Sequence, residues 1–217
     1  MKIMTSLPLA ICMIATISLT TLHASNNKVS FSWALLVDKE HGQESADIKS
    51  SIEISGKSTL QFYFSREPGT FLYLFLLDSG GTLALIFPET PDHYVTSPPK
   101  AGTFRIPPNP DRFSTAPPPG QERLYLLASS SRLITLENLA NDFAREPDSP
   151  KLKAAILQEM KKLRRKHSTL SQSPETSVPV AGTIRTRSAT PGTENTFMVT
   201  RVSGVPFYSR TLRINHE

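Results

Sequence analysis

Residues 71–88 read FLYLFLLDSGGTLALIFP, two apolar runs joined by a short polar turn. Short apolar runs rich in aromatic residues and bounded by turn residues are typical of strands, and glycine accepts the positive φ that tight hairpin turns require. The stretch therefore predicts a β-hairpin. Its first run, Phe71–Leu77, is apolar on both faces, so we expect this strand inside the fold with a cover on each side.

Further strands are predicted on the N-terminal side of this hairpin. Val29–Val37 alternates large apolar residues with small ones, which places Phe31, Trp33 and Leu35 on one face. Residues 51–55 and 59–64 form two shorter alternating runs, and the polar stretch 38–47 is expected to be a loop.

On the C-terminal side, residues 89–120 are rich in proline. Proline has no N–H to donate to a sheet, so we expect an extended loop with one short strand near Thr103–Ile106. Arg123–Ala128 again reads as a strand.

Helical periodicity appears next. Leucines and small residues recur at spacings of three and four from Leu133 to Phe143, with Thr135 as the expected cap. A second helix is predicted from Pro150 to Lys166, capped by Ser149 with proline at its first position.

The C-terminal part is predicted to contain a linker, residues 168–179, and strands at 180–187, 196–202 and 205–214. Ser203-Gly204 is expected to turn a hairpin between the last two. Three strands cannot bury a core alone, so we expect them to pair with strands that precede Ser131.

These elements predict a mainly β, β-sandwich-like fold with two α-helices inserted before the C-terminal strands. The expected organisation is a single β-rich domain over residues 25–217. Its parts are a core at 51–131, a helical insertion at 133–167, the linker at 168–179 and the C-terminal strands at 180–214.

Residues 1–24 have the pattern of a cleaved signal peptide: a lysine at position 2, an apolar run from Ile11 to Leu22, and Ala24 before a polar stretch. An uncleaved anchor is the alternative. We expect a periplasmic or secreted protein, and the only cysteine, Cys12, would be removed with the signal. Without thiols the exported chain would form no disulfides and hold no thiolate-bound zinc.

The formal net charge is +5, and much of the excess is carried by one run near the end of the second predicted helix. We expect these cations chiefly to complement the helix dipole and to keep that face solvated. A weak peripheral contact with anionic membrane or glycan is the alternative, and nucleic acid is not an expected partner of an exported protein. The run is Lys161, Lys162, Arg164, Arg165 and Lys166.

Residues 51–131 carry ordered motifs that resemble the bacterial domain-of-unknown-function family numbered 4384. The motifs are LYLFLLDSG at 72–80, IFP at 86–88, GTFRIP at 102–107, PGQE at 119–122 and LLAS at 126–129. The resemblance implies a β-sandwich-like envelope module that is often found beside other domains. It implies no enzyme, because the family has no assigned catalytic residues.

No catalytic or cofactor pattern is found in the sequence. The histidines lack metal-ligand spacing, no serine lies in a nucleophile elbow, and there is no glycine-rich phosphate loop. We therefore expect no enzyme and no cofactor. Side chains in and beside the proline-rich loop are the candidate contact surface, because prolines hold extended loops rigid. They are Glu89, Asp92, His93, Tyr94, Phe104 and Phe113.

Together these features predict a non-catalytic exported envelope module for protein or ligand binding or assembly. Its partner would be an envelope protein or glycan. The alternative is a hydrolase, with Glu89 and Asp92 as its acidic pair, or a binder that acts on an envelope polymer or an anionic surface.

Overall fold

The computed structural model describes residues 27–39, 42–55, 58–114, 119–168, 174–182 and 195–216. The predicted signal peptide lies outside the described residues, and so do residues 183–194 of the predicted C-terminal strand region. Within the described part of the chain, none of the helices combines the length and apolar character that crossing a bilayer requires.

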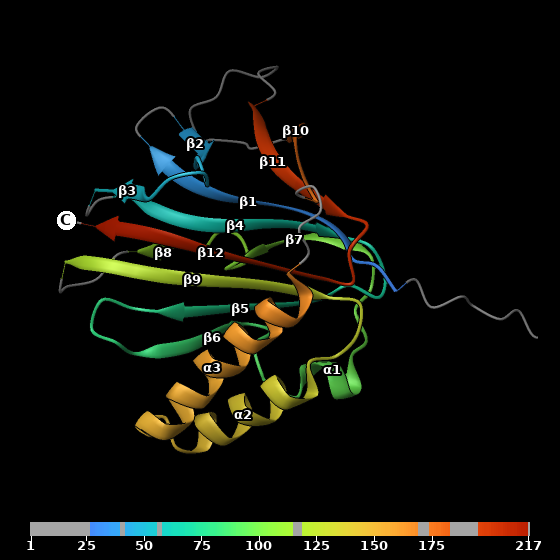
Figure 1. Cartoon of the computed structure of the whole chain (residues 1–217). Helices are drawn as coiled ribbons and strands as arrows, with labels where there is room; N and C mark the ends of the chain where they lie inside the picture. The colour runs from blue at the N-terminus through green and yellow to red at the C-terminus, as the bar shows by residue number, and fades with distance from the viewer. Residues whose placement is uncertain are drawn as a thin grey trace, which may run out of the picture.

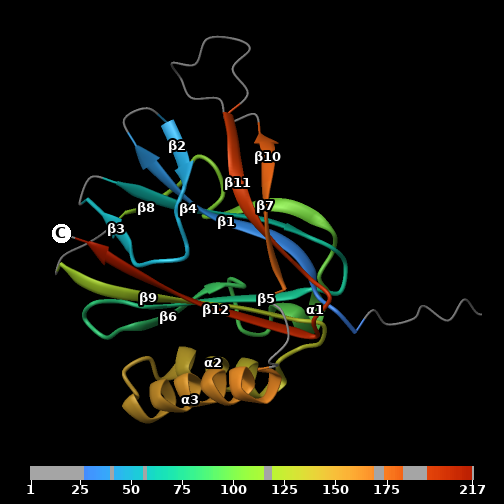
Figure 2. The same ribbon diagram turned by 45° about the horizontal axis from the view of Figure 1, so that its top comes forward.

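Two β-sheets pack face to face, and a helical layer covers the outer face of the second (Figures 1 and 2). Sheet A has the strand order β10 (Glu175–Gly182), β11 (Asn195–Ser203), β1 (Ser30–Lys39), β4 (Thr59–Arg66), β7 (Gly102–Ile106), with β2 (Gly42–Ser45) beside β1 and β8 (Phe113–Ser114) beside β4. Sheet B has the order β3 (Ile52–Ile54), β12 (Phe207–His216), β9 (Gly120–Ser129), β5 (Phe71–Leu77), β6 (Leu83–Phe87). The mainly β, sandwich-like fold is confirmed.

The β5–β6 hairpin predicted from residues 71–88 is present, with Leu77 paired to Leu83. β5 lies inside sheet B, and its two faces are both covered as expected. Leu72 and Leu74 face the core between the sheets, whereas Tyr73 and Phe75 face the helical layer. The core between the sheets also takes in the largest buried side chains of sheet A, among them Trp33, Phe62 and Phe64.

The helical layer consists of α2 (Ile134–Arg145) and α3 (Pro150–His167), and the short α1 (His93–Thr96) follows β6. Ser149 caps α3 as predicted, since its Oγ accepts from Leu152 N–H at 3.4 Å. The predicted cap of α2 is wrong, because the capping position is Leu133 and not Thr135. Leu133 N–H donates instead to Tyr73 Oη at 3.1 Å, so a contact with sheet B fixes the start of this helix.

The C-terminal strands pair with earlier ones as expected: β11 lies beside β1, and β12 lies between β9 and β3. The predicted hairpin at Ser203-Gly204 is wrong, because β11 belongs to sheet A and β12 to sheet B. The segment between them crosses from one sheet to the other. Its backbone is held by Val29 N–H, which donates to Val205 C=O at 2.7 Å, and by Ser130 N–H, which donates to Pro206 C=O.

Two predicted loops are shorter than expected. Part of the stretch 38–47 forms β2, which folds back on β1 because Val37 and Glu44 come into register. The linker predicted to extend to residue 179 ends earlier, since β10 begins at Glu175. Pro179 is tolerated in β10 because this strand forms the edge of sheet A.

Candidate functional site

A groove of about 360 Å³ lies where α3 crosses the outer face of sheet B. Its floor comes from outward-facing residues of β5, β9 and β12, and its wall comes from Leu157, Met160, Lys161 and Arg164 of α3. Strand alternation fixes the floor, because the neighbours of these residues along each strand point into the core between the sheets. The floor residues are Leu77, Arg123, Tyr125, Leu127, Ser209 and Thr211.

Arg123 of β9 lies directly opposite Arg213 of β12 in the antiparallel ladder. Both side chains are exposed on the outer face, and Leu77 of β5 continues the same row on the other side of Arg123. Like charges directly opposite each other in a sheet are destabilising. The register of β9 with β12 therefore places two arginines side by side with no carboxylate between them in the ladder.

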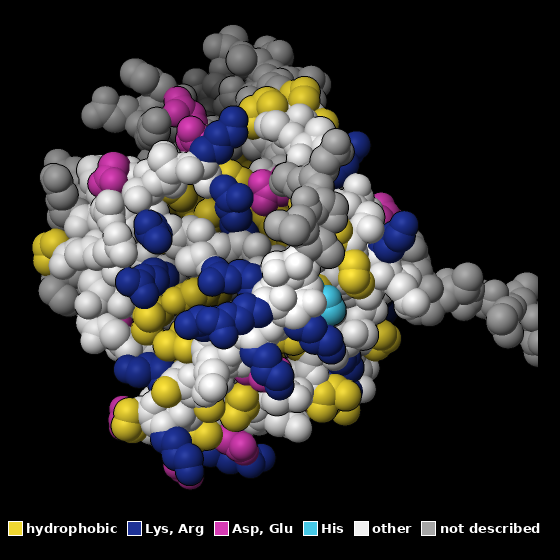
Figure 3. Space-filling model, in the orientation of Figure 1, with side chains coloured by type: hydrophobic (Ala, Val, Ile, Leu, Met, Phe, Trp, Pro, Cys, Tyr) yellow, Lys and Arg dark blue, Asp and Glu magenta, His cyan; other side chains and the backbone are white. Residues whose placement is uncertain are grey.

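Lys161 and Arg164 of α3 add two more cations to this place. Within the described part of the chain, the side chains of these two residues and of the arginine pair form no ion pair or hydrogen bond. The groove lining contains no carboxylate, and the further arginine in it, Arg210, is committed to Glu175 and to Ile48 C=O. Figure 3 shows Lys and Arg side chains gathered around apolar ones on this face. Arg123, Lys161 and Arg164 line the groove, and Arg213 lies opposite Arg123 in the ladder, outside the lining. We call these four cations with the floor the basic groove.

The predicted basic cluster is therefore divided between two sides of α3. Arg164 lines the basic groove, and Lys161 lines both this groove and a depression between α2 and α3. Lys162, Arg165 and Lys166 line only that depression, where Lys162 pairs with Glu159 at 3.2 Å. All five are exposed and lie in the last turns of their helix, a position that complements the helix dipole.

The predicted contact surface does not form one surface. Tyr94 is only 3 % exposed, and this prediction is wrong for it. Its hydroxyl donates to Leu72 C=O at 2.9 Å and accepts from Leu72 N–H, so it fastens α1 to the start of β5. Burial raises the pKa of Tyr94 above that of a free tyrosine. Tyr94, although it lies in the proline-rich segment, is a core residue.

The other candidate contact residues fall into two places: His93 and Phe104 lie near Phe87, and Phe113 lies on β8. The His93 ring lies tilted near Phe87, with ring centroids 6.4 Å apart. Phe104 is half-buried between Phe64 and Phe87, with Arg66 over its ring at 5.2 Å. Glu89 and Asp92 are exposed beside them. Phe113 pairs with Leu60 of β4, whereas Phe104 pairs with Phe64, four residues further along the same strand. Phe113 packs into the core between the sheets.

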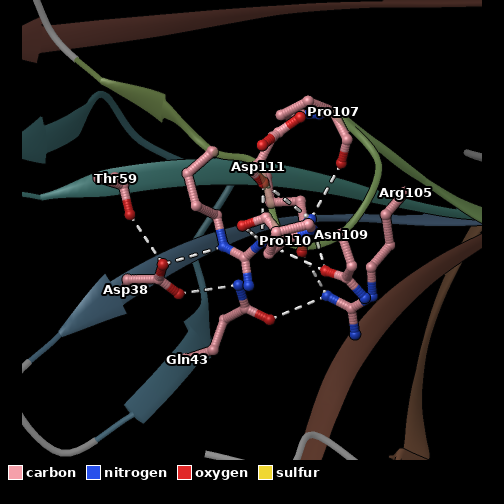
Figure 4. A network of polar contacts seen from close by, with 10 residues as sticks. Asp38, Gln43, Thr59, Arg105, Pro107, Asn109, Pro110 and Asp111 are labelled. Atoms are coloured by element: carbon pink, nitrogen blue, oxygen red, sulfur yellow. Dashed lines mark hydrogen bonds and ion pairs between the residues drawn. The ribbon is translucent and has the colours of Figure 1, made fainter.

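A polar network covers part of the outer face of sheet A (Figure 4). Gln61 is 0 % exposed and lies at its centre: its amide donates to Pro107 C=O and to Asn109 Oδ1, both at 3.0 Å, and its carbonyl accepts from Arg105. Arg112 donates to Asp38 at 3.0 Å. Because each charge in this network has partners within it, the network holds the loop 107–112 against the sheet and does not resemble a ligand site.

Glu137 is a buried carboxylate that joins α2 to sheet B. It accepts from Tyr73 Oη at 2.6 Å and from Arg132 Nε at 3.0 Å. Burial, and then the hydrogen bond to Glu137, raise the pKa of Tyr73 far above its ordinary value. This carboxylate is fully engaged and therefore positions the helix.

Within the described residues, no three His, Cys, Asp or Glu side chains cluster closely enough to hold a metal ion. The candidate site residues that sequence reasoning missed are Arg123 and Arg213. Their outward positions could be read from the alternation of RLYLL and TLRIN. Their juxtaposition depends on the register of β9 with β12, which are far apart in the sequence.

The comparison with curated proteins gave no match, and neither did the comparison with solved structures. A family model, the domain of unknown function DUF4384, matches residues 55–132. This segment holds β4 to β9 and so supplies strands to both sheets, including Arg123 of the basic groove. Lys161, Arg164 and Arg213 lie outside it. The resemblance of the central segment of this chain to the DUF4384 family is thereby confirmed.

Proposed function

We propose that the protein is a non-catalytic, exported envelope module whose basic groove binds an anionic glycan. The observation that carries the proposal is the exposed Arg123–Arg213 pair. Like charges directly opposite each other in a sheet repel, and a bound anion would remove the repulsion. Export rests on the signal-peptide pattern of residues 1–24.

The chemistry of the groove favours carboxylate or phosphate groups on a polar chain. Guanidinium groups bind such oxyanions through two parallel hydrogen bonds. Ser209 and Thr211 supply hydroxyls on the floor, and Tyr125 supplies a half-buried ring between them and β5. A sugar with an acidic substituent combines the hydroxyls, apolar ring face and negative charge that this lining complements.

The shape of the site favours a narrow polymer over a flat membrane. Three of the cations line the groove, one on the sheet and two on the helix that walls it, so a ligand must enter the groove to meet these three. Arg213 lies next to Arg123 across the ladder. A lipid surface would instead meet cations on the exposed side of α3, such as Lys162, Arg165 and Lys166.

Two variants with equal loss of charge test the proposal. The groove variant carries Arg123→Gln, Arg164→Gln and Arg213→Gln, and the control carries Lys162→Gln, Arg165→Gln and Lys166→Gln. Binding to a soluble polyuronate and to phosphatidylglycerol vesicles is measured by titration at several salt concentrations. We expect the groove variant to bind polyuronate about tenfold more weakly, since a few exposed ion pairs together amount to roughly 1–2 kcal/mol.

The control variant should bind polyuronate within about twofold of the parent, because its changed residues lie outside the groove. Equal losses in the two variants would mean that only net charge matters and would refute a specific groove. Binding to vesicles alone, abolished in the control variant, would favour a membrane contact through α3.

A further inference from the structure

A second cavity, of about 390 Å³, is lined by residues of both sheets near the β5–β6 turn and the end of β12. Figure 1 shows that this turn and the end of β12 lie at the same end of the sandwich. This volume is at the small end of ligand pockets, which run from roughly 300 to 1,000 Å³. Its walls are inward-facing apolar residues of both sheets, and Phe113 closes one side. The walls include Leu60, Phe62, Leu76, Ile86, Leu124 and Ile214.

The polar groups of this cavity are acidic or neutral. Asp78 and Glu122 line it, together with hydroxyls of Ser79, Thr82 and Ser114, and the lining contains no lysine or arginine. Asp78 is partly engaged, because its Oδ1 accepts from Thr82 N–H within the turn. Glu122 points between the sheets, on the same face of β9 as Leu124 and Leu126.

Glu122 has one ionisable partner among the described residues. His216 Nε2 lies 3.4 Å from Glu122 Oε1, a contact that is an ion pair only when His216 is protonated, and this buried nitrogen forms no hydrogen bond. Burial raises the pKa of the Glu122 carboxyl, His216 lowers it, and the charge of Asp78 raises it. A carboxylate in an apolar cavity is stabilised when a cation or a hydrogen-bond donor comes to it.

We propose that this cavity binds a slender apolar chain that ends in a cationic head, with the chain between the sheets and the head against Glu122 and Asp78. The apolar walls would take the chain, and the two carboxylates would select an ammonium group over a carboxylate. This site is distinct from the basic groove, which has the opposite charge and lies on the outer face of sheet B.

Binding of decylammonium, decanoate and decanol, each below its micelle concentration, tests the proposal by calorimetric titration of the full chain. We expect decylammonium to bind at one site and about tenfold more tightly than decanoate. One partly buried ion pair between the ammonium group and a carboxylate accounts for a difference of this size. The Glu122→Gln variant should reduce that preference to less than about threefold. Decanol should fall between the two charged probes.

Filling the cavity provides the second test. Leu76→Phe and Ile86→Phe each add volume to the wall and should weaken decylammonium and decanol alike, with folding checked by the thermal transition. The groove variant Arg123→Gln, Arg164→Gln, Arg213→Gln should bind decylammonium as the parent does. The proposal is overturned if the parent binds none of the probes, if decanoate binds as tightly as decylammonium, or if a folded filled variant binds decylammonium unchanged.

Discussion

The Tyr73 hydroxyl of β5 donates a hydrogen bond of 2.6 Å to the Glu137 carboxylate of α2, although the two residues are 64 positions apart. The same hydroxyl accepts from Leu133 N–H at the start of that helix. One tyrosine thus fixes both the start of α2 and a carboxylate in its first turn. The helical layer is attached to sheet B by this contact as well as by apolar packing.

Removing the buried carboxylate should loosen this attachment. Glu137→Ala leaves the Tyr73 hydroxyl and Arg132 without their acceptor, and we expect a loss of about 3 kcal/mol in the free energy of unfolding. Urea denaturation measures it. Tyr73→Phe should cost less, about 1–2 kcal/mol, because one hydroxyl is removed and the carboxylate keeps Arg132. Losses that simply add in the double variant would show that the two side chains do not act together.

Gln61 should control the loop 107–112. Gln61→Leu removes the donor to Pro107 C=O and Asn109 and the acceptor of Arg105, and we expect a loss of about 2–3 kcal/mol. Amide exchange should rise in the loop more than in sheet B. Gln121→Leu is the control, because Gln121 is exposed and bonds only to Asn215 among the described residues. Equal effects of the two substitutions would argue against the network.

Glu122 should make the fold less stable as the pH rises. Its folded pKa lies above the ordinary value of about 4.5, so the folded state binds the proton more tightly than the unfolded state does. The stability it contributes is fully present below the unfolded pKa and is lost as the pH rises through the folded pKa. Unfolding by urea between about pH 4 and pH 7 should therefore show the parent losing stability relative to Glu122→Gln. A parallel pH dependence of the two proteins would contradict this.

Deletion of the C-terminal strands tests whether the chain folds as one unit. β12 lies between β9 and β3, and β11 lies beside β1, so removing residues 195–217 exposes strands of both sheets. We expect the cooperative thermal transition to disappear. A truncated protein that melts as the parent does would show two independent parts.

Export predicts a shortened protein. N-terminal sequencing of the protein recovered from the periplasm or medium should begin at or within about two residues of Ser25, as the small-residue cleavage pattern indicates. An intact Met1 in that fraction would contradict cleavage.

The strands were largely predictable, as was the β5–β6 pairing, but the exact partners and registers of distant strands were not. Alternation in Val29–Val37 and the apolar runs at 71–88 identify strands, because each has a local period. A short glycine-bearing connection such as Ser203-Gly204 can turn a hairpin or cross between sheets, and only the packing of the two strands decides. The arginine pair depends in the same way on pairing between distant strands.

Burial was the other limit on the sequence-based predictions. Tyr94 lies in a short proline-flanked segment that looks like surface, yet its ring packs edge-on against Phe71 and Tyr73 beneath the helical layer. The division of the basic run between two sides of α3 also needed the position of sheet B, since the helix alone does not show which cations meet the sheet.

The crossing from β11 to β12 has a consequence for how the chain folds. An interior strand of sheet B is made from residues 207–216, so β3 has no partner in this sheet, and β9 has only β5, until this segment arrives. Contacts between distant parts of a chain form slowly, because loop closure must come before they stabilise anything. If the chain is exported as proposed, the lack of residues 207–216 would keep sheet B incomplete and the chain threadable until its far end arrives.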